Sequence, residues 1–164
     1  MYHRIKIRFR LDRLKMNIDI MKRLMSIAVE EAKRGYDEGG VPVGAVIANE
    51  SGEIIAQGHN LHHQNGDPTS HGETQCVRNA GRRRDWNELT LVTTLSPCSM
   101  CSGMTCLLNF KRVIVGDRQS FNGKTEWLED AGIPVIFLDD SACIELMDTM
   151  LRERPELWME DIGK

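Results

Sequence analysis

The sequence predicts an α/β fold, a three-layer α/β/α sandwich around a mixed five-stranded sheet. Segments with helical periodicity alternate with short apolar runs along most of the chain, and the first two apolar runs follow each other directly across a tight turn. Two strands joined by a tight turn pair antiparallel, whereas strands separated by helices are expected to be parallel through right-handed crossovers. The sheet is therefore expected to contain both kinds of pairing.

Each element follows from a local pattern. Apolar side chains at helical spacing predict helices, short apolar runs predict buried strands, and a stretch rich in Gly, Asn, His, Asp and Pro predicts a loop. In the first half of the chain, these patterns predict a helix over 18–34, strands over 43–48 and 53–57, a loop over 58–70 and a helix from 70. In the second half, strands over 89–95, 113–115 and 135–138 alternate with helices that begin at 96, cover 125–131 and run from 140 to about 154, and a short helix follows from 155.

The starts of the second and third helices are indicated by capping residues. Ser70, followed three positions later by Glu73, matches a capping box. Ser96 and Pro97 suit an N-cap and a first helical position, respectively. We therefore expect these two helices to begin at Ser70 and Ser96.

Length, charge and cysteine content limit the class of protein. The chain has 164 residues with 41% hydrophobic and 27% charged, which is typical of a globular domain. The net charge of −3 argues weakly against nucleic acid as the main partner. No stretch approaches the roughly 18 uninterrupted apolar residues of a membrane span. The five cysteines, an odd number, and the absence of a secretory apolar region predict reduced thiols and a cytoplasmic location.

The first fifteen residues differ from the rest. Residues 1–15 alternate Arg and Lys with apolar side chains and form a basic arm, whereas residues 16–164 are expected to form a single domain. An edge strand, a frayed helix and a mis-assigned translation start all remain open for this arm. We expect no catalytic role for it.

Two short motifs carry the chemistry. The first is His71-Gly72-Glu73, and the second is the run 97–101, Pro-Cys-Ser-Met-Cys. Cys98 and Cys101 are three positions apart, so both can contact one ion from the same helix face. They lie in the first turn of a predicted helix, where free N–H groups and the helix dipole favour a thiolate.

His71, Cys98 and Cys101 are the predicted ligands of one catalytic Zn²⁺ ion per subunit. Three protein ligands leave the fourth tetrahedral position for water, as in catalytic zinc sites. Zinc lowers the pKa of that water from 15.7 toward roughly 7. Glu73 is better suited to moving protons than to binding the metal. The H-x-E and P-C-x-x-C pair is the pattern of zinc-dependent nucleobase deaminases, so the sequence predicts a hydrolytic deaminase.

Other interpretations of the cysteines remain open. A Cys-x-x-Cys pair alone also suits a redox motif, but that would leave His71 and Glu73 unexplained. A structural zinc site would need a fourth protein ligand, and a zinc fold without catalysis, used for assembly, would not need Glu73. Candidate fourth ligands without compelling spacing are His59, His62, His63, Cys76 and Cys106. Cys76, Cys106 and Cys143 are otherwise expected to be small core residues.

The chain resembles the small yeast-type cytosine deaminases of the zinc-dependent cytidine/deoxycytidylate deaminase superfamily. The similarity runs from Asp19 to the C-terminus and includes GGVPVGA, GHN at 58–60, HGE, TLSPCSMC, VGDRQSFNG and the tail ERPELWMEDIG. The zinc motif belongs to the whole superfamily, and the tail is more specific to this branch. The resemblance implies a homodimer, a closed pocket for a free base and a role in pyrimidine salvage, with cytosine converted to uracil and ammonia.

The resemblance also implies roles around the substrate. Asn60 and the Gly72 backbone N–H would bind the ring carbonyl region, and the Ser96 carbonyl would accept from the exocyclic amine. Phe121 and His71 would sandwich the ring. The remaining implied contacts are Trp158 closing the pocket, Asp161 accepting a ring N–H, and Val43 lining the floor.

Each of these residues also has an ordinary structural interpretation. Asn60 could be a turn residue, Phe121 a core aromatic, and Trp158 with Asp161 one face of a terminal helix. Arg82, Arg83 and Arg84 are expected to be a solvated helix end rather than a phosphate clamp.

The chain departs from the family after GHN. His62 and His63 stand there, where the family usually has an aromatic residue at the pocket mouth, and we expect His63 to contact the substrate. Polar replacements beside a base pocket can change which ring fits. Isocytosine, creatinine, guanine and a pterin therefore remain alternative substrates, and tRNA adenosine remains another.

Overall fold

The computed structural model describes residues 16–164, so the expectation for the arm over 1–15 lies outside the described residues. The helices are α2 (Ile18–Asp37), α3 (His62–Asn65), α4 (Gly72–Ala80), α5 (Ser99–Leu108), α6 (Thr125–Asp130), α7 (Ser141–Glu153) and α8 (Pro155–Asp161), with a 3-10 turn at Trp86–Glu88. The strands are β1 (Gly44–Ala48), β2 (Ile54–His59), β3 (Thr90–Leu95), β4 (Arg112–Asp117) and β5 (Val135–Phe137).

The five strands form one mixed sheet in the order β2-β1-β3-β4-β5. Strand β1 pairs antiparallel with β2 and with β3, whereas β3, β4 and β5 run parallel. The predicted α/β class and mixed five-stranded sheet are confirmed. Because β3 and β4 end at the same edge of the sheet, the segments that follow them meet there.

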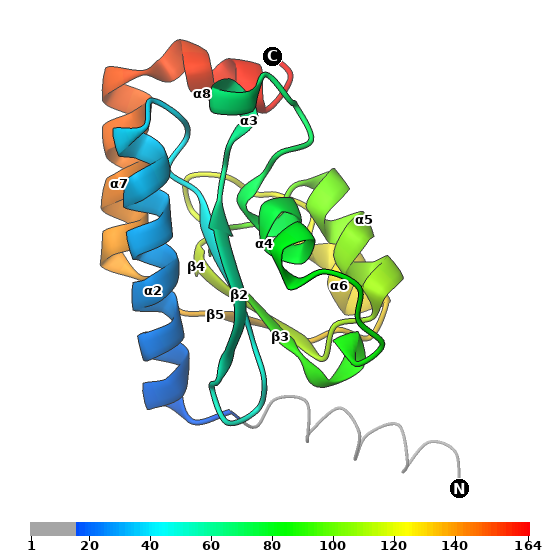
Figure 1. Ribbon diagram of the computed structural model, residues 1–164. Helices are drawn as coiled ribbons and strands as arrows, with labels where there is room; N and C mark the ends of the chain where they lie inside the picture. The colour runs from blue at the N-terminus through cyan, green and yellow to red at the C-terminus, as the bar shows by residue number, and fades with distance from the viewer. Residues whose placement is uncertain (1–15) are drawn as a thin grey trace, which may run out of the picture.

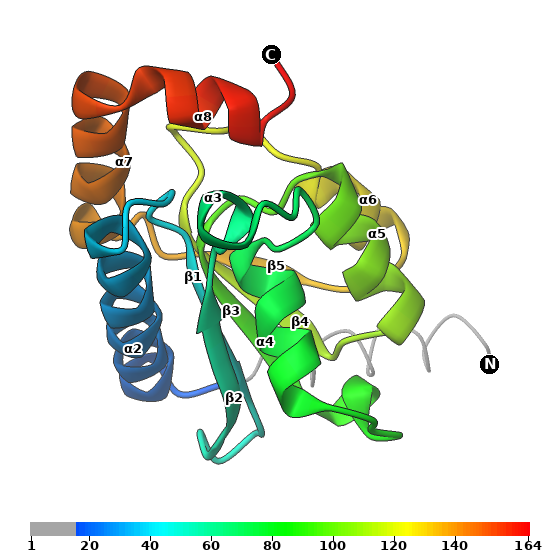
Figure 2. The same cartoon turned by 45° about the horizontal axis from the view of Figure 1, so that its top comes forward.

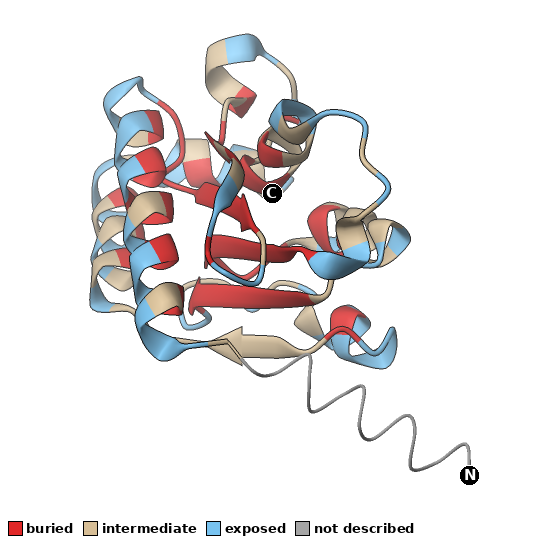
Figure 3. Cartoon of the chain, turned by 60° about the horizontal axis from the view of Figure 1, so that its bottom comes forward, coloured by how far each residue is buried: buried red, intermediate tan, exposed pale blue. Residues whose placement is uncertain are grey.

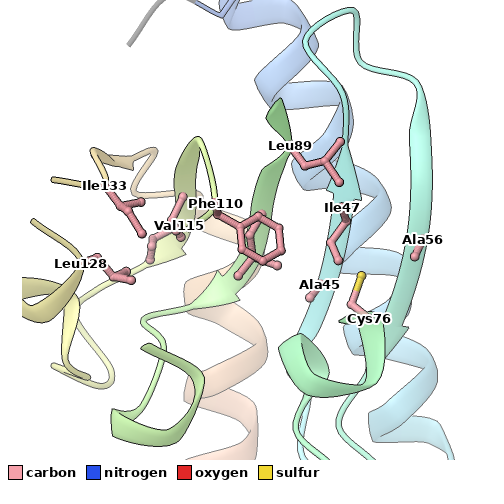
Figure 4. Close-up of a cluster of buried hydrophobic side chains, with 11 residues drawn as sticks. Ala45, Ile47, Ala56, Cys76, Leu89, Phe110, Val115, Leu128 and Ile133 are labelled. Carbon is pink, nitrogen blue, oxygen red and sulfur yellow. The ribbon is translucent and has the colours of Figure 1, made fainter. Parts of the chain in front are cut away.

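Helices cover both faces of the sheet. Helices α2 and α7 lie on one face, and α4, α5 and α6 lie on the other (Figures 1 and 2). Successive side chains of a strand point to opposite faces. Ala45 and Ile47 accordingly pack in the cluster beneath α4 and α6 (Figure 4), whereas Val46 and Ala48 pack against α2. The central strands β1, β3 and β4 are therefore buried throughout (Figure 3).

Both predictions of a serine N-cap are wrong. Helix α4 begins one residue after His71, and α5 begins one residue after Cys98. The Ser70 hydroxyl instead donates to Asp67 Oδ2 at 2.8 Å, inside the preceding turn. The Ser96 N–H donates to the Asp117 carbonyl at 2.9 Å, which extends the pairing of β3 with β4. The N-cap of each helix is therefore a predicted metal ligand.

The expected loop over 58–70 contains the short helix α3. The Leu61 N–H donates to the Ser70 carbonyl at 2.8 Å, which closes this segment on itself. Gly66 ends the helix in the left-handed conformation, with φ 63°. A single helical turn is too short to show helical periodicity, which explains why the sequence pattern did not indicate it.

The C-terminal helix α8 lies over one end of the sheet, beside α3 (Figures 1 and 2). Its Trp158 is buried in a third apolar cluster, whose other members are Val41, Val43, Leu95, Met147 and Met150. Leu95 is the last residue of β3. Helix α8 thus covers the edge from which the Cys98 segment departs. Within residues 16–164, none of the helices has the length and apolar character needed to cross a membrane.

Candidate active site

Two helix N-termini bring the three predicted metal ligands together. His71 and Cys98 are the N-caps of α4 and α5, and both have extended backbone angles, with ψ 163° and 177°. Cys101 is three residues after Cys98, in the first turn of α5. Because helical side chains tilt toward the N-terminus, these positions converge on the space between the two helix ends.

The distances among the ligand atoms fit a zinc ion. His71 Nδ1 lies 3.5 Å from Cys98 Sγ and 3.7 Å from Cys101 Sγ. A tetrahedral ion with the usual Zn–N and Zn–S bond lengths would separate a nitrogen and a sulfur ligand by roughly 3.6 Å. One imidazole and two thiols also form a donor set that selects zinc over hard cations.

The protonation of these ligands follows from their contacts. Burial alone would lower the pKa of His71, but its hydrogen bond with Cys98 and the charges of Glu73 and Asp161 raise that pKa to about 9. A hydrogen bond from Cys101 lowers the pKa of Cys98 to about 4 against the effect of burial, with help from His71. That hydrogen bond, together with burial, raises the pKa of Cys101 well above its usual value. Without metal at neutral pH, the site is an imidazolium, a thiolate and a thiol.

Zinc binding to the metal-free protein should release about two protons at neutral pH, because each ligand must be deprotonated to coordinate. One proton comes from His71 and one from Cys101. Protons compete with the metal, so zinc affinity should increase as the pH rises toward the His71 pKa of about 9. Isothermal titration calorimetry in two buffers of different ionisation enthalpy measures the proton count. Binding without proton release would contradict these protonation states.

Glu73 occupies the second position of α4 and is buried, with 3% of its surface exposed. Thr93 of β3 donates a hydrogen bond to Glu73 Oε1 at 3.3 Å. Burial, and then the negative charge on Cys98, raise the pKa of Glu73 above the ordinary value for a carboxyl. A carboxyl with a raised pKa holds a proton more readily than an ordinary carboxyl, and its place beside the metal ligands suits proton transfer.

Gly72 lets α4 approach β1 closely. A Cβ at this position would lie 2.8 Å from the Val43 carbonyl oxygen, which is closer than real Cβ atoms come to other atoms. Both residues are buried. The glycine between His71 and Glu73 therefore permits the contact that fixes the N-terminus of α4 against the sheet.

A pocket of about 580 Å³ opens beside the metal ligands. Phe121 and Trp158 form an aromatic corner of its wall, with ring centroids 5.4 Å apart and an interplanar angle of 87°. The size falls within the range typical of small-molecule sites. Its lining includes Val43, Asn60, His71, Glu73, Leu95, Ser96, Cys98, Met100, Phe121, Asn122, Trp158, Asp161 and Ile162.

A carboxylate held by its neighbours lines the pocket close to the metal ligand His71. Asp161 Oδ1 accepts from Asn60 Nδ2 at 2.9 Å and lies 3.0 Å from His62 Nδ1. The other oxygen, Oδ2, is 3.9 Å from His71 Nε2. Asn60 is itself held, because its Oδ1 accepts from the His62 N–H at 2.9 Å. Two neighbours thus orient Asp161 before any ligand binds.

Comparison with known proteins assigns the family. Residues 19–117 match the zinc-binding region of cytidine and deoxycytidylate deaminases. The chain belongs to this deaminase family. Its members deaminate hydrolytically at C–N bonds and bind zinc, and the predicted zinc ligands of this chain all lie within the matched region.

Three relatives illustrate the range of the family. The deaminase is 40% identical to a cytosine deaminase of Candida albicans, over 87% of this chain and 97% of that protein. It is 42% identical to a tRNA-specific adenosine deaminase of Aquifex aeolicus, over 55% of this chain and 61% of that protein. A solved structure of a tRNA:A34 deaminase is 25% identical with a TM-score of 0.66, covering 76% of this chain and 99% of that one.

The pocket of this deaminase collects most of the predicted contact residues. Those lining it are Val43, Asn60, Ser96, Phe121, Trp158 and Asp161, together with His71, Glu73 and Cys98. Cys101 lies deeper and is fully buried, and Gly72 packs behind the pocket against Val43. His63 differs from our expectation: it is not among the lining residues, and its ring stacks on His62 with centroids 4.7 Å apart.

The contact between His62 and Asp161 was not expected from the sequence. The only sequence signal was the replacement of the usual aromatic segment by two histidines, and we attributed the effect to His63. Because α3 is a single helical turn without a periodic pattern, the sequence does not indicate which of its two histidines contacts Asp161. Lining residues not expected from the motifs include Leu95, Met100, Asn122 and Ile162.

Proposed function

We propose that this deaminase converts cytosine to uracil and ammonia. The observation that carries the proposal is the Asp161 carboxylate, which lines the pocket close to His71 and is held by Asn60 and His62. In that position Oδ2 can accept a hydrogen bond from a ring N–H of a small base. The likeness to the Candida albicans cytosine deaminase over nearly all of that protein supports the same substrate.

The reaction replaces the exocyclic C–N bond of the base with a carbonyl, using one water molecule and releasing ammonia. A zinc ion held by His71, Cys98 and Cys101 would supply an activated water at neutral pH. Glu73 would accept a proton from that water and deliver it to the ring nitrogen, and then assist departure of the amine. Its burial and raised pKa suit both directions of transfer.

The pocket walls would fix the base in one orientation. Phe121 and His71 would stack on the two faces of the ring, and Trp158 would close the open side. The Ser96 carbonyl would accept from the exocyclic amine before it leaves. Of the lining residues, Asn60 would bind the ring carbonyl region and Val43 would form the floor. The backbone N–H of Gly72, whose α-carbon packs against Val43, would assist Asn60.

A substrate panel tests the proposal directly. Ammonia release is measured with zinc-loaded protein on cytosine, cytidine, isocytosine, creatinine, guanine, a pterin and an unmodified tRNA. We expect the highest kcat/KM on cytosine and a lower kcat/KM on the nucleoside, because the proposed closure of the pocket by Trp158 would oppose entry of the added ribose. A higher kcat/KM on any other compound would overturn cytosine as the substrate.

The Asp161→Asn change should lower kcat/KM on cytosine by roughly tenfold to a hundredfold, the usual worth of one hydrogen bond to a charged group. The amide of asparagine can place a donor N–H where the carboxylate oxygen accepted a hydrogen bond. A ring N–H of the base would then face another donor and would no longer be recognised. The matched control is Glu156→Gln on the same helix, which is exposed and outside the pocket lining. Equal kcat/KM for Asp161→Asn and wild type would contradict the role of Asp161.

Adenosine in tRNA is the second candidate substrate, favoured by the 42% identity to the Aquifex aeolicus enzyme. That reaction needs a flipped nucleotide to enter from a nucleic-acid surface. The net charge of −3 and the cover that α8 provides over the site argue for a free base instead. Inosine formation in the tRNA arm of the panel would favour this candidate.

We further propose a homodimer in the cytoplasm with a role in pyrimidine salvage. The exposed side chains of Leu107 on α5 and Trp127 on α6, 84% and 45% accessible, support an apolar contact between subunits. Reduced thiols at Cys98 and Cys101 are required for metal binding and suit a reducing compartment. Sedimentation analysis distinguishes a dimer from a monomer.

A further inference from the structure

A second group of metal-binding side chains joins α3 to the C-terminal helix. His62, His63 and Asp161 offer ligand atoms that all lie within 4.8 Å of one another. Helix α3 lies beside α8 in both Figure 1 and Figure 2, so the group links two segments that are far apart in the sequence. None of the three residues is a ligand in the His71, Cys98 and Cys101 site.

The two ring nitrogens of His63 make no hydrogen bonds to the described residues. Both nitrogens are buried. Leaving buried polar atoms unpaired is unfavourable and calls for an explanation. The carboxylate of the exposed Glu160 lies 3.5 Å from His63 Nε2 and 4.0 Å from His62 Nε2.

We propose that His62, His63 and Asp161 bind a second zinc ion, which inhibits the enzyme. Two imidazoles and a carboxylate suit a divalent transition metal, and the exposed Glu160 carboxylate nearby adds negative charge. His62 Nδ1 and Asp161 Oδ1 are 3.0 Å apart. Two nitrogen or oxygen ligands of a tetrahedral zinc ion are separated by about 3.3 Å, so the pair needs little adjustment.

Inhibition follows because Asp161 belongs to both sites. A metal ion on Oδ1 displaces the hydrogen bonds from Asn60 and His62 and draws electron density from the carboxylate. Oδ2 then becomes a weaker acceptor for the ring N–H, so the base binds less tightly. The ion also ties α8, which carries Trp158, to α3. This step rests on the proposed function, whereas metal binding itself does not.

Metal content tests the site without any substrate. Protein already loaded with its catalytic zinc is dialysed against increasing free Zn²⁺ and its metal content is measured. We expect a second equivalent in the wild type and in the control Glu129→Gln, an exposed carboxylate on α6. We expect only one equivalent in His63→Phe and in His62→Gln, each confirmed as folded by circular dichroism. One equivalent in the wild type, or two in both histidine variants, would overturn the proposal.

Cobalt identifies which ligands the second ion uses. Added Co²⁺ should give weak visible bands without the intense thiolate charge-transfer bands that coordination by Cys98 and Cys101 would produce. Thiolate charge-transfer bands that grow in intensity as the second equivalent of Co²⁺ binds would show that the ion is bound by the cysteines, and would overturn the assignment.

Kinetics tests the inhibition. On cytosine, saturating Zn²⁺ should raise the apparent KM of the wild type about tenfold or more with kcat unchanged, and should leave KM of His63→Phe unaffected. A second equivalent that leaves KM unchanged would overturn the inhibitory role. If the second equivalent binds and cytosine is not deaminated at all, the metal site stands and the proposed substrate fails.

Discussion

Glu73→Gln should reduce ammonia release from cytosine by about 10²- to 10⁴-fold, the usual contribution of a positioned acid or base. The glutamine side chain has nearly the same shape and can still accept the Thr93 hydrogen bond at the position of Oε1. It cannot accept a proton and pass it on. Because the effect is on chemistry, kcat should fall while KM changes little.

The same variant should keep its metal and its fold. Glu73 is not one of the side chains whose geometry fits the zinc ion. Its side chain is only 3% exposed, so replacing the carboxyl with an amide removes the unfavourable burial of a charge. Zinc content by atomic absorption and the melting temperature check these points. Loss of zinc from Glu73→Gln would show that Glu73 acts on the metal site, and full activity would refute its role in proton transfer.

Cys98→Ser should remove zinc and bring deaminase activity to background. A serine hydroxyl is a poor zinc ligand, and the substitution also removes the thiolate that holds His71 as an imidazolium. Two protein ligands remain, too few for a stable catalytic site. The chain should nonetheless fold, because 164 residues bury a core large enough to be stable without a metal.

Cys106→Ser is the matched control, since Cys106 lies on the same helix and its thiol contacts the Trp127 carbonyl instead. Added zinc should raise the melting temperature of the wild type and of Cys106→Ser but not of Cys98→Ser. Binding at a hundredfold excess over Kd stabilises a protein by about 2.7 kcal/mol, which is readily detected. A zinc-dependent shift in Cys98→Ser would show that Cys98 is dispensable.

The sheet and the metal ligands could be predicted from sequence because their signals are local. Strands β1, β3 and β4 are short apolar runs, and the ligands lie in two motifs of three and five residues. The exact helix starts could not be predicted in the same way. Ser96 looks like a cap, yet its N–H continues the pairing between β3 and β4, a contact with Asp117 twenty-one residues away.

The outer wall of the pocket was harder to predict because it depends on long-range contacts. Asn60 and Asp161 are 101 residues apart and meet only when α8 folds over the sheet. The choice between His62 and His63 depends on a single helical turn that has no periodic signal. Cys76 and Cys143 belong to none of the metal-binding motifs and, as expected, are buried in the core. Cys106 is partly buried and packs against the same apolar cluster as Cys76.

The division of the site between two regions of the chain has an evolutionary consequence. The metal ligands and Glu73 all lie within residues 19–117, whereas Trp158 and Asp161 belong to a seven-residue helix near the end of the chain. Under the proposed roles of Trp158 and Asp161, substitutions in that helix would alter the accepted base without disturbing the metal ligands. A lineage of such proteins would then diversify its substrates by small changes in this helix, while the metal ligands and Glu73 are inherited unchanged.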